Sequence, residues 1–386
     1  MDATTFRNTA QEPSTWGELK KDFDGGECYV ACYQKGNDIY YASTPKTSAI
    51  RPMWLLVMAR SSRKVFKGVD VLTNYASNAN ARSNSETGIM QLTLDNSPKI
   101  SKTSPLGLTA PTGGVFRISL DRIQAALAAK YKVPDAKKTL VNDIQSFTAS
   151  VKDSEGNYAT AGTHTVHRLY LAAAFLLLRK KHQGNSKDGV VALVVDKTGN
   201  VVSWGMKNPD VSCWHGETSA LMALGGVAPA GGCVFSTLKP CKMCAGLIVD
   251  SGASQVKAYY GQDDPGDDAD NTALDRTGLG KTLDAHKAHN MPYGLMVKPA
   301  SAAKATPLGS ALHSGFSGQK GTVGGIVSPI EYVNSSGAVQ LMAATEEALK
   351  NKIKKYKATD VKLNPNTKQV VEYLADFLRL QGISLD

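Results

Sequence analysis

The first part of the chain alternates short apolar segments with turn residues, which is typical of strands joined by tight connections. Residues 27–33 and 38–42 are rich in β-forming side chains, and Lys35-Gly36-Asn37 separates them. This arrangement predicts a β-hairpin. Residues 53–58 form an uninterrupted apolar run of strand length, and we expect another strand there.

The pattern is weaker from there to residue 160. Residues 74–114, rich in Asn, Ser, Thr, Pro and Gly, form a long region with little apolar periodicity. A strand over 115–118 should lead into a helix capped by Ser119. Apolar residues at helical spacing follow, namely Leu140, Val141, Ile144, Phe147 and Val151. Residues 1–160 are thus interpreted as a mixed α/β region of unknown role, without a catalytic motif.

Helices and strands alternate from about residue 164 onward. The pattern predicts a helix over 166–181, strands over 190–195 and 201–205, a short helix from His215, a strand over 233–237, a helix from Cys241 and a strand over 255–260. The later strands should be parallel, because a helical crossover returns the chain to the same edge of the sheet. We therefore predict an α/β fold, a three-layer α/β/α sandwich.

Two amphipathic helices are expected at the end of the chain, after a glycine-rich connection. The first has an apolar face from Val339 to Tyr356, and the second has one from Val370 to Leu378 and ends near Gly382. The chain then has three parts: the N-terminal region over 1–160, the sandwich over 161–300, and the connection with the C-terminal helices over 301–386.

The composition is that of an ordinary globular protein. Hydrophobic residues make up 42% and charged residues 20% of the 386 residues, which excludes a disordered or fibrous chain. The longest apolar run, residues 169–178, is much shorter than the roughly 20 residues that cross a membrane. The first residues lack the features of a secretory signal. We expect a cytoplasmic protein without a membrane partner, with non-classical export left open.

The net charge of +10 is spread over all three parts of the chain. A positive balance permits an anionic partner such as nucleic acid but does not require one. Five lysines between residues 350 and 357 stand on a predicted terminal helix. They form either a phosphate-binding face or an ordinary solvated one.

Cysteine and histidine spacing indicates a metal site. Six cysteines are too few for a disulfide framework in a chain of this length, and two of them form a C-x-x-C pair. His215-Gly216-Glu217 precedes Pro240-Cys241-Lys242-Met243-Cys244, and both motifs stand at the start of a predicted helix. One imidazole and two thiolates suit zinc and leave its fourth position open, as in catalytic sites. We predict a zinc site of His215, Cys241 and Cys244.

Glu217 is the candidate for proton transfer. Helix N-termini favour the thiolate form of the predicted cysteine ligands. Zinc lowers the pKa of a bound water to about 7, and a carboxylate beside it can accept that proton and pass it on. Because Glu217 is two residues from a ligand, we predict that it is a proton shuttle and not a ligand.

H-x-E followed by P-C-x-x-C is the signature of zinc nucleobase deaminases. Residues 190–261 carry it together with G-x-x-N at 205–208, the strand CVFSTLKPC, the helix CAGLIVDSG and the strand VKAYYGQDD. In these features the chain resembles the cytidine deaminase-like superfamily over about 164–300. S-T-L-x-P-C-x-M-C-A-G and Y-G-x-x-D are most similar to tRNA adenosine deaminases, guanine deaminases and bacterial toxin-type deaminases. The resemblance implies the fold of this superfamily. It also implies that Asn208 contacts the base or sugar and that the backbone at Gly216 contacts the ring.

Two aromatic residues flank the predicted pocket. Trp214 precedes the predicted zinc ligand His215, and Phe235 lies on the strand before the cysteines. Each ring can stack on a base or pack in the core, and both alternatives are open. Cys213 and Cys233 are most simply small apolar core residues.

The leading hypothesis is a zinc-dependent hydrolytic deaminase that releases ammonia from a nucleobase. We favour a base within single-stranded DNA or RNA, because the positive charge and the length outside the sandwich exceed what a small substrate needs. One alternative is a deaminase of free nucleosides or nucleobases, and another is a catalytically inactive zinc-binding module that serves in assembly. The target base and the oligomeric state are open.

Overall fold

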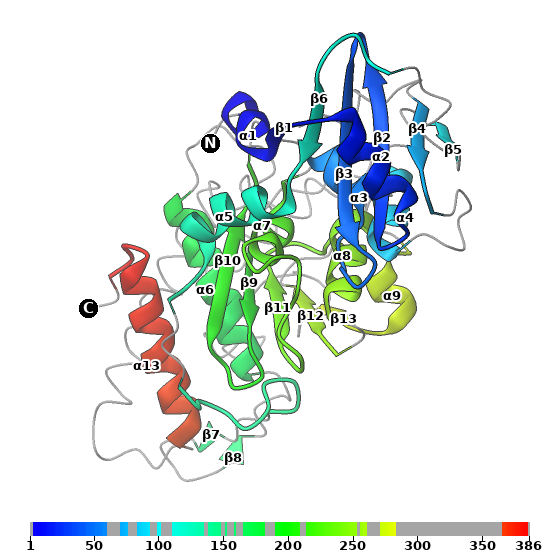
Figure 1. Ribbon diagram of the computed structural model, residues 1–386. Coiled ribbons are helices and arrows are strands. Elements are labelled where there is room, and N and C mark those ends of the chain that lie inside the picture. Colours follow the sequence, from blue (N-terminus) through cyan, green and yellow to red (C-terminus); the bar gives the residue numbers. More distant parts are fainter. Residues whose placement is uncertain are drawn as a thin grey trace, which may run out of the picture.

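Two larger β-sheets and their helices make up most of the described part of the chain (Figure 1). The structure is a computed structural model. It describes residues 3–59, 70–75, 83–92, 99–101, 110–134, 138–147, 151–152, 158–159, 165–181, 190–208, 214–252, 255–260, 271–282 and 365–384.

The N-terminal sheet has six strands in the order β1-β6-β3-β2-β4-β5. Their bounds are β1 (Gln11–Ser14), β2 (Cys28–Lys35), β3 (Asp38–Pro45), β4 (Asp70–Thr73), β5 (Lys99–Ser101) and β6 (Val115–Ile118). The predicted hairpin is confirmed, because β2 and β3 pair antiparallel throughout their length. The predicted strand over 115–118 is β6. Ser119 caps the next helix, α5 (Leu120–Tyr131), by accepting a hydrogen bond from the Arg122 N–H group.

Helices cover both faces of this sheet. On one face α2 (Trp16–Asp24) buries Leu19 and Phe23 against Val30 and Tyr41. On the other face α3 (Pro52–Ala59) packs against the alternate residues of β2 and β3. The alternation of side chains along each strand therefore supplies two separate apolar surfaces.

The apolar run at 53–58 is part of the helix α3, so the strand expected there is wrong. All eight residues of α3 are buried, and a helix without a polar face has no visible helical period in its sequence. A short continuous apolar run fits a buried strand and a buried helix equally. Pro52 stands at the first helical position, where its fixed φ and missing N–H are both tolerated.

A helix also lies within the region 74–114, where the sequence has little apolar periodicity. This helix, α4 (Asn84–Leu92), is stabilised from a distant part of the chain. The Asp250 carboxylate accepts hydrogen bonds from the backbone N–H groups of Asn84 at 3.1 Å and Ser85 at 2.7 Å. These bonds satisfy N–H groups that a helix start leaves open, and local sequence gives no sign of them.

Residues 138–147 contain no helix, although their apolar residues recur at helical spacing. The side chains of Leu140, Val141 and Ile144 are buried. Their backbone N–H groups donate instead to the carbonyls of Thr198 and Lys197, at 2.9 to 3.1 Å. The spacing thus reflects burial of an irregular segment against the turn that contains Lys197 and Thr198. A two-stranded sheet of β7 (Val151–Lys152) and β8 (Tyr158–Ala159) follows.

The second sheet has the order β10-β9-β11-β12-β13. Its strands are β9 (Val191–Val195), β10 (Val201–Met206), β11 (Cys233–Ser236), β12 (Lys257–Tyr260) and β13 (Gly280–Thr282). β11 and β12 pair parallel, as the sequence predicts, and β13, for which the sequence predicts no strand, pairs parallel with β12. α6 (Thr165–Lys181) covers one face, and α7 (Gly216–Met222) and α8 (Lys242–Gly252) lie on the other, with α9 (Ala273–Thr277) beside α8. The predicted three-layer α/β/α sandwich is confirmed.

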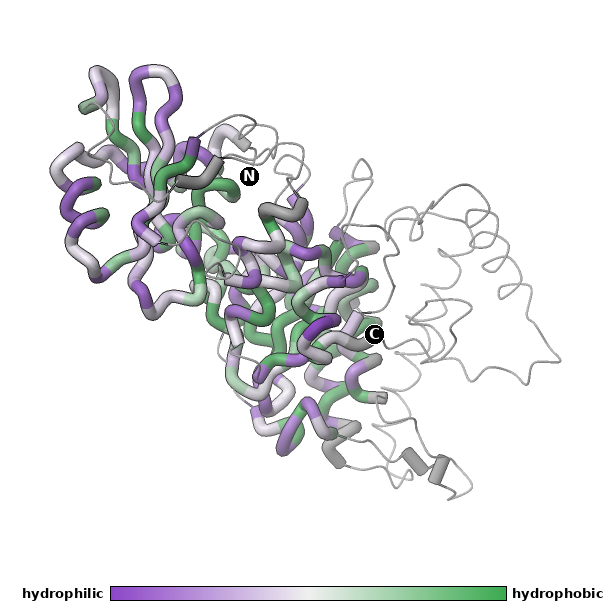
Figure 2. Tube along the Cα trace, turned by 90° about the vertical axis from the view of Figure 1, so that its right-hand side faces the viewer, coloured by the Kyte–Doolittle hydropathy of each residue, from purple (hydrophilic) through white to green (hydrophobic). Residues whose placement is uncertain are grey.

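One apolar core connects the N-terminal region with the sandwich. A continuous cluster of buried side chains extends from α1 (Ala3–Ala10) and α3 to α6, β9 and α8. Hydrophobic segments accordingly gather in the middle of the described tube in Figure 2. α4 lies directly along α8.

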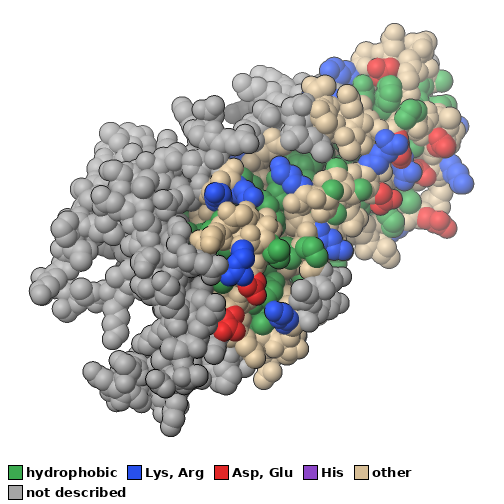
Figure 3. Space-filling view, turned by 90° about the vertical axis from the view of Figure 1, so that its left-hand side faces the viewer, with side chains coloured by type: hydrophobic (Ala, Val, Ile, Leu, Met, Phe, Trp, Pro, Cys, Tyr) green, Lys and Arg blue, Asp and Glu red, His purple; other side chains and the backbone are tan. Residues whose placement is uncertain are grey.

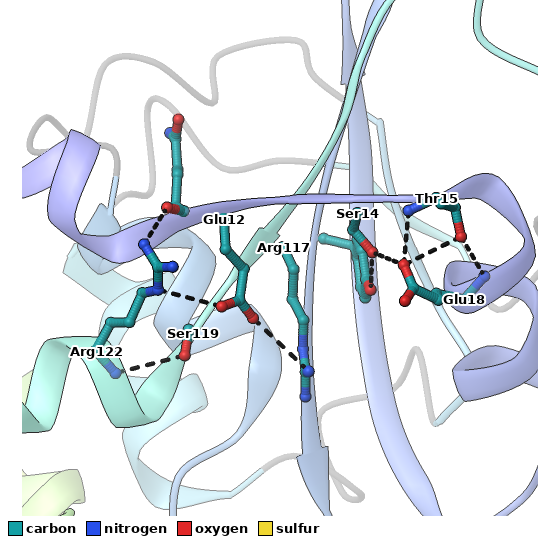
Figure 4. A network of polar contacts seen from close by, with 9 residues as sticks. Glu12, Ser14, Thr15, Glu18, Arg117, Ser119 and Arg122 are labelled. Carbon is teal, nitrogen blue, oxygen red and sulfur yellow. Dashed lines mark hydrogen bonds and ion pairs between the residues drawn. The ribbon is translucent and has the colours of Figure 1, made fainter.

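Polar contacts hold the first elements against β6 and α5 (Figure 4). Glu12 on β1 forms ion pairs with Arg117, at 3.7 Å, and with Arg122, at 3.2 Å. Thr15 and Glu18 form a capping box at the start of α2. Because these groups are partly exposed, each ion pair contributes little to stability, but together the contacts fix where α1 leaves the sheet.

The C-terminal helix α13 (Pro365–Leu380) packs against α6. Its Tyr373 hydroxyl accepts a hydrogen bond from the Val201 N–H group at 2.7 Å. This is the second predicted terminal helix, whereas the one expected from Val339 to Tyr356 lies outside the described residues. Among the described helices, none combines the length and apolar character needed to cross a membrane.

Candidate active site

The start of α7 places His215 and Glu217 against the second sheet. His215 is the N-cap residue, with extended backbone angles, and Gly216 is the first helical residue. A Cβ atom at Gly216 would lie 2.8 Å from the Val190 carbonyl oxygen and 3.0 Å from the Ala192 nitrogen. Only glycine lets the helix begin this close to β9. The close approach brings the side chain of Glu217 to the end of β11.

Three predicted metal ligands lie together at this point. The His215 Nδ1 atom is 3.5 Å from the Cys241 Sγ atom and 3.5 Å from the Cys244 Sγ atom. All three donor atoms lie within 4.8 Å of one another. Ordinary Zn–S and Zn–N bonds at a tetrahedral angle would separate nitrogen from sulfur by about 3.6 Å. The donor types and their spacing therefore fit a zinc ion.

Glu217 is buried beside this cluster, and its two oxygens have different surroundings. Oε1 accepts a hydrogen bond from the Ser236 hydroxyl at 2.7 Å. Oε2 is also buried but has no hydrogen-bond partner among the described residues. A buried polar atom without a partner is costly, so this oxygen indicates a missing partner such as water or substrate. Glu217 does not belong to the donor cluster of His215, Cys241 and Cys244.

Neighbouring groups shift the pKa values of these side chains. A hydrogen bond from Cys244, together with nearby His215, holds the pKa of Cys241 well below that of an ordinary thiol. Burial and the adjacent Cys241 sulfur raise the pKa of Cys244. Burial lowers the pKa of His215, but Cys241 and Glu217 raise it, and the net shift is upward. Burial raises the pKa of Glu217, against the opposing effects of His215 and Ser236.

Asn208 and Trp214 are joined by a backbone hydrogen bond, and Trp214 directly precedes His215. The Asn208 N–H group donates to the Trp214 carbonyl at 2.8 Å. The Trp214 side chain is buried, and its ring meets Phe6 of α1 edge to face, with 3.8 Å between centroids. Its Nε1 atom has no hydrogen-bond partner among the described residues. The N-terminal helix therefore contacts the residue that precedes His215.

Phe235 lies on the opposite face of the sheet from Glu217. Its ring stacks on Tyr170 of α6 at 4.9 Å and on Tyr259 of β12 at 5.5 Å, and it is completely buried. The structure thus places Phe235 in the core, which is the packing alternative. Its neighbour Ser236 points to Glu217, because successive side chains of a strand face opposite sides. The deaminase motif does not include Ser236, but the alternation of side chains along the strand predicts that it lies on the opposite face from Phe235.

Two other contacts surround the site. The Thr218 hydroxyl lies 3.5 Å from the Cys244 Sγ atom. Lys239, just before the cysteine motif, forms an ion pair with Asp275 of α9 at 3.3 Å.

A separate cavity of about 140 Å³ lies between α13 and the β9–β10 hairpin, and its lining includes Asn200 and Phe377 but no predicted site residue.

Comparison with known proteins covers part of the chain. Residues 181–285 match the family model of Bd3614-like deaminases. Among solved structures, the dCMP deaminase from the cyanophage S-TIM5, in its apo form, is 24% identical. That match covers 31% of this chain and 97% of the other, with a TM-score of 0.25. No curated protein matches the chain.

Proposed function

We propose that the chain is a zinc-dependent hydrolytic nucleobase deaminase with Glu217 as its proton carrier. The match of residues 181–285 to the family model of Bd3614-like deaminases supports this proposal. The observation that carries the proposal is the pairing of two features. A His-Cys-Cys donor cluster has zinc-like spacing, and a buried carboxylate beside it keeps one oxygen without a partner among the described residues.

His215, Cys241 and Cys244 would hold the zinc ion. When bound, zinc supplies the activation of water that a hydrolytic reaction needs at neutral pH. The residues themselves contribute charge and rigidity. Cys241 is readily ionised, because hydrogen bonding lowers its pKa. Burial and Cys241 raise the pKa of Cys244, so its thiolate form would depend on the bound metal.

Glu217 would move protons within the closed site. Its Oε1 atom is occupied by Ser236, so Oε2 is the oxygen that can take up a proton and release it to the leaving amino group. Burial raises the pKa of this carboxyl group. A proton carrier is most effective when its pKa lies near the pH at which the enzyme works, and the upward shift moves the pKa of Glu217 toward neutral pH.

The substrate in this proposal is a base within a single-stranded polynucleotide. The net charge of +10 and the extensive N-terminal region support this choice. Figure 3 shows Lys and Arg side chains interspersed with Asp and Glu on the displayed face, so no single basic stripe dominates the described part of that face. Asn208 and Trp214, which are joined by a backbone hydrogen bond, are the proposed contacts to the base, together with the backbone at Gly216.

The test is a substrate panel assayed with purified protein. Cytidine, adenosine, guanine and single-stranded DNA and RNA are incubated with the protein, and released ammonia and base conversion are measured. We expect turnover of a polynucleotide, with binding that weakens as salt rises. If only free nucleosides or bases are turned over, the protein acts on small molecules and not on a polynucleotide. If zinc-loaded protein turns over none of these substrates, the protein is a zinc-binding module without catalytic activity.

The matched variant is Glu217→Gln, which keeps the shape of the side chain and removes its proton-carrying group. We expect normal zinc content and a fall in turnover of about 100-fold or more. Loss of zinc in this variant would instead show that Glu217 is a ligand. Undiminished turnover would exclude it as the proton carrier.

A further inference from the structure

We propose that Ser236 is a positioning residue that holds Glu217 in a single orientation and leaves Oε2 as its working oxygen. This inference rests on the proposed function, because it gives Glu217 the role of proton carrier. Ser236 itself would not touch the substrate. It would act through its hydrogen bond to the carboxylate.

The geometry is that of a specific, buried contact. Ser236 and Glu217 are 1% and 2% exposed, and the Ser236 Oγ atom is 2.7 Å from Oε1. Ser236 is the last residue of β11, whose main chain is fixed by pairing with β9 on one side and β12 on the other. A hydroxyl on a central strand is a rigid anchor for a side chain on the neighbouring helix.

The consequence concerns rotation of the carboxylate. Without the Ser236 hydroxyl, the Glu217 carboxylate would lose the side-chain donor that holds Oε1, and the side chain could turn toward other groups. One such group is His215, which lies close enough to influence the pKa of Glu217. A proton carrier must stay within hydrogen-bond reach of the group that it serves, and small displacements are costly to the rate.

The chain offers a matched control in Ser203. This serine on β10 is also fully buried, and its hydroxyl donates to the Ala220 carbonyl of the same helix, α7, at 2.8 Å. Ser203→Ala therefore removes an equivalent buried hydroxyl bond to α7 without touching Glu217. Ser236→Thr restores the hydroxyl at the position under test.

The experiment compares Ser236→Ala, Ser236→Thr and Ser203→Ala in zinc-loaded full-length protein. For Ser236→Ala we expect kcat to fall about 10- to 100-fold with little change in KM, since the lost bond is to a charged group. Ser236→Thr should recover most of this loss. Ser203→Ala should lower stability but leave kcat near that of the wild type. Equal kcat in Ser236→Ala and Ser203→Ala would overturn the inference.

A second readout does not depend on turnover. Crystal structures of Ser236→Ala and Ser203→Ala should show Glu217 in more than one orientation in the first variant and in one orientation in the second. A single unchanged orientation of Glu217 in Ser236→Ala would overturn the inference even if no substrate is found. If Ser236→Ala does not fold, Ser236→Cys takes its place, because a thiol is of similar size but a weak donor. Failure of the wild type to turn over any substrate concerns the proposed function alone.

Discussion

Gly246→Ala tests whether the N-terminal region is built into the active-site layer. Gly246 lies in α8, two residues after Cys244, where α8 lies against the start of α4. A Cβ atom at this position would lie 2.5 Å from the Asn84 carbonyl carbon and 2.6 Å from the Ser85 nitrogen. Real Cβ atoms essentially never come within 3.0 Å of other heavy atoms. The two helices would have to move apart by about half an ångström or more.

Two features oppose a movement of α4 away from α8. The obstructing atoms are backbone atoms, and the Asp250 carboxylate holds Asn84 and Ser85 through hydrogen bonds to their N–H groups. Overpacking of this kind costs about 1–3 kcal/mol, and the better helix propensity of alanine returns about 1 kcal/mol. We expect a net loss of up to about 2 kcal/mol in the free energy of unfolding.

The assay is urea unfolding of the wild type, Gly246→Ala and a control, Gly17→Ala. Gly17 is an exposed glycine of α2, and the nearest neighbour of a Cβ atom added there would be the Thr15 Oγ1 atom, at 3.9 Å. The same substitution should therefore stabilise the protein there, by about 0.5–1 kcal/mol. Opposite shifts of the two midpoints are expected. If Gly246→Ala is as stable as Gly17→Ala, the backbones of α4 and α8 do not approach each other at Gly246 as closely as described.

Two further predictions concern the metal centre and the loop beside it. The double variant with Cys241→Ser and Cys244→Ser should lose its zinc, which elemental analysis measures, because only His215 of the donor cluster remains; full zinc content would refute the site. Phe6→Ala should destabilise the protein by about 3–5 kcal/mol, and it should change the tryptophan emission spectrum, since Phe6 packs on Trp214. An emission change of the same kind in Phe6→Leu, which refills the volume, would point to the aromatic contact, and unchanged spectra in both would contradict it.

The sandwich could be predicted because its signals are local. Each strand and helix from α6 to β12 has a continuous apolar pattern, and the ligand motif repeats known spacing over two helix starts. The N-terminal region was predicted less well, for reasons that lie in tertiary structure. α3 has no polar face, α4 begins with a cap provided by Asp250, and residues 138–147 pack irregularly on a turn.

The candidate site shows the same distinction. His215, Cys241 and Cys244 could be identified because their chemistry depends on residue type and spacing along the chain. The surroundings of Glu217 could not be read from the motif, because they depend on which face of β11 each residue occupies. Ser236 and Phe235 are neighbours in sequence, yet one contacts Glu217 and the other packs on α6.

The position of α8 connects these observations. Its first turn carries Cys244, and the helix contacts both α7 and α4. The backbones of α4 and α8 approach so closely that only glycine fits at Gly246 and Gly88. A shift of α4 would therefore move the helix that carries a predicted zinc ligand. Since His215 is fixed separately, by the close approach of Gly216 to β9, such a shift would change the distance between nitrogen and sulfur donors. We therefore expect Gly246→Ala to lower zinc affinity as well as stability.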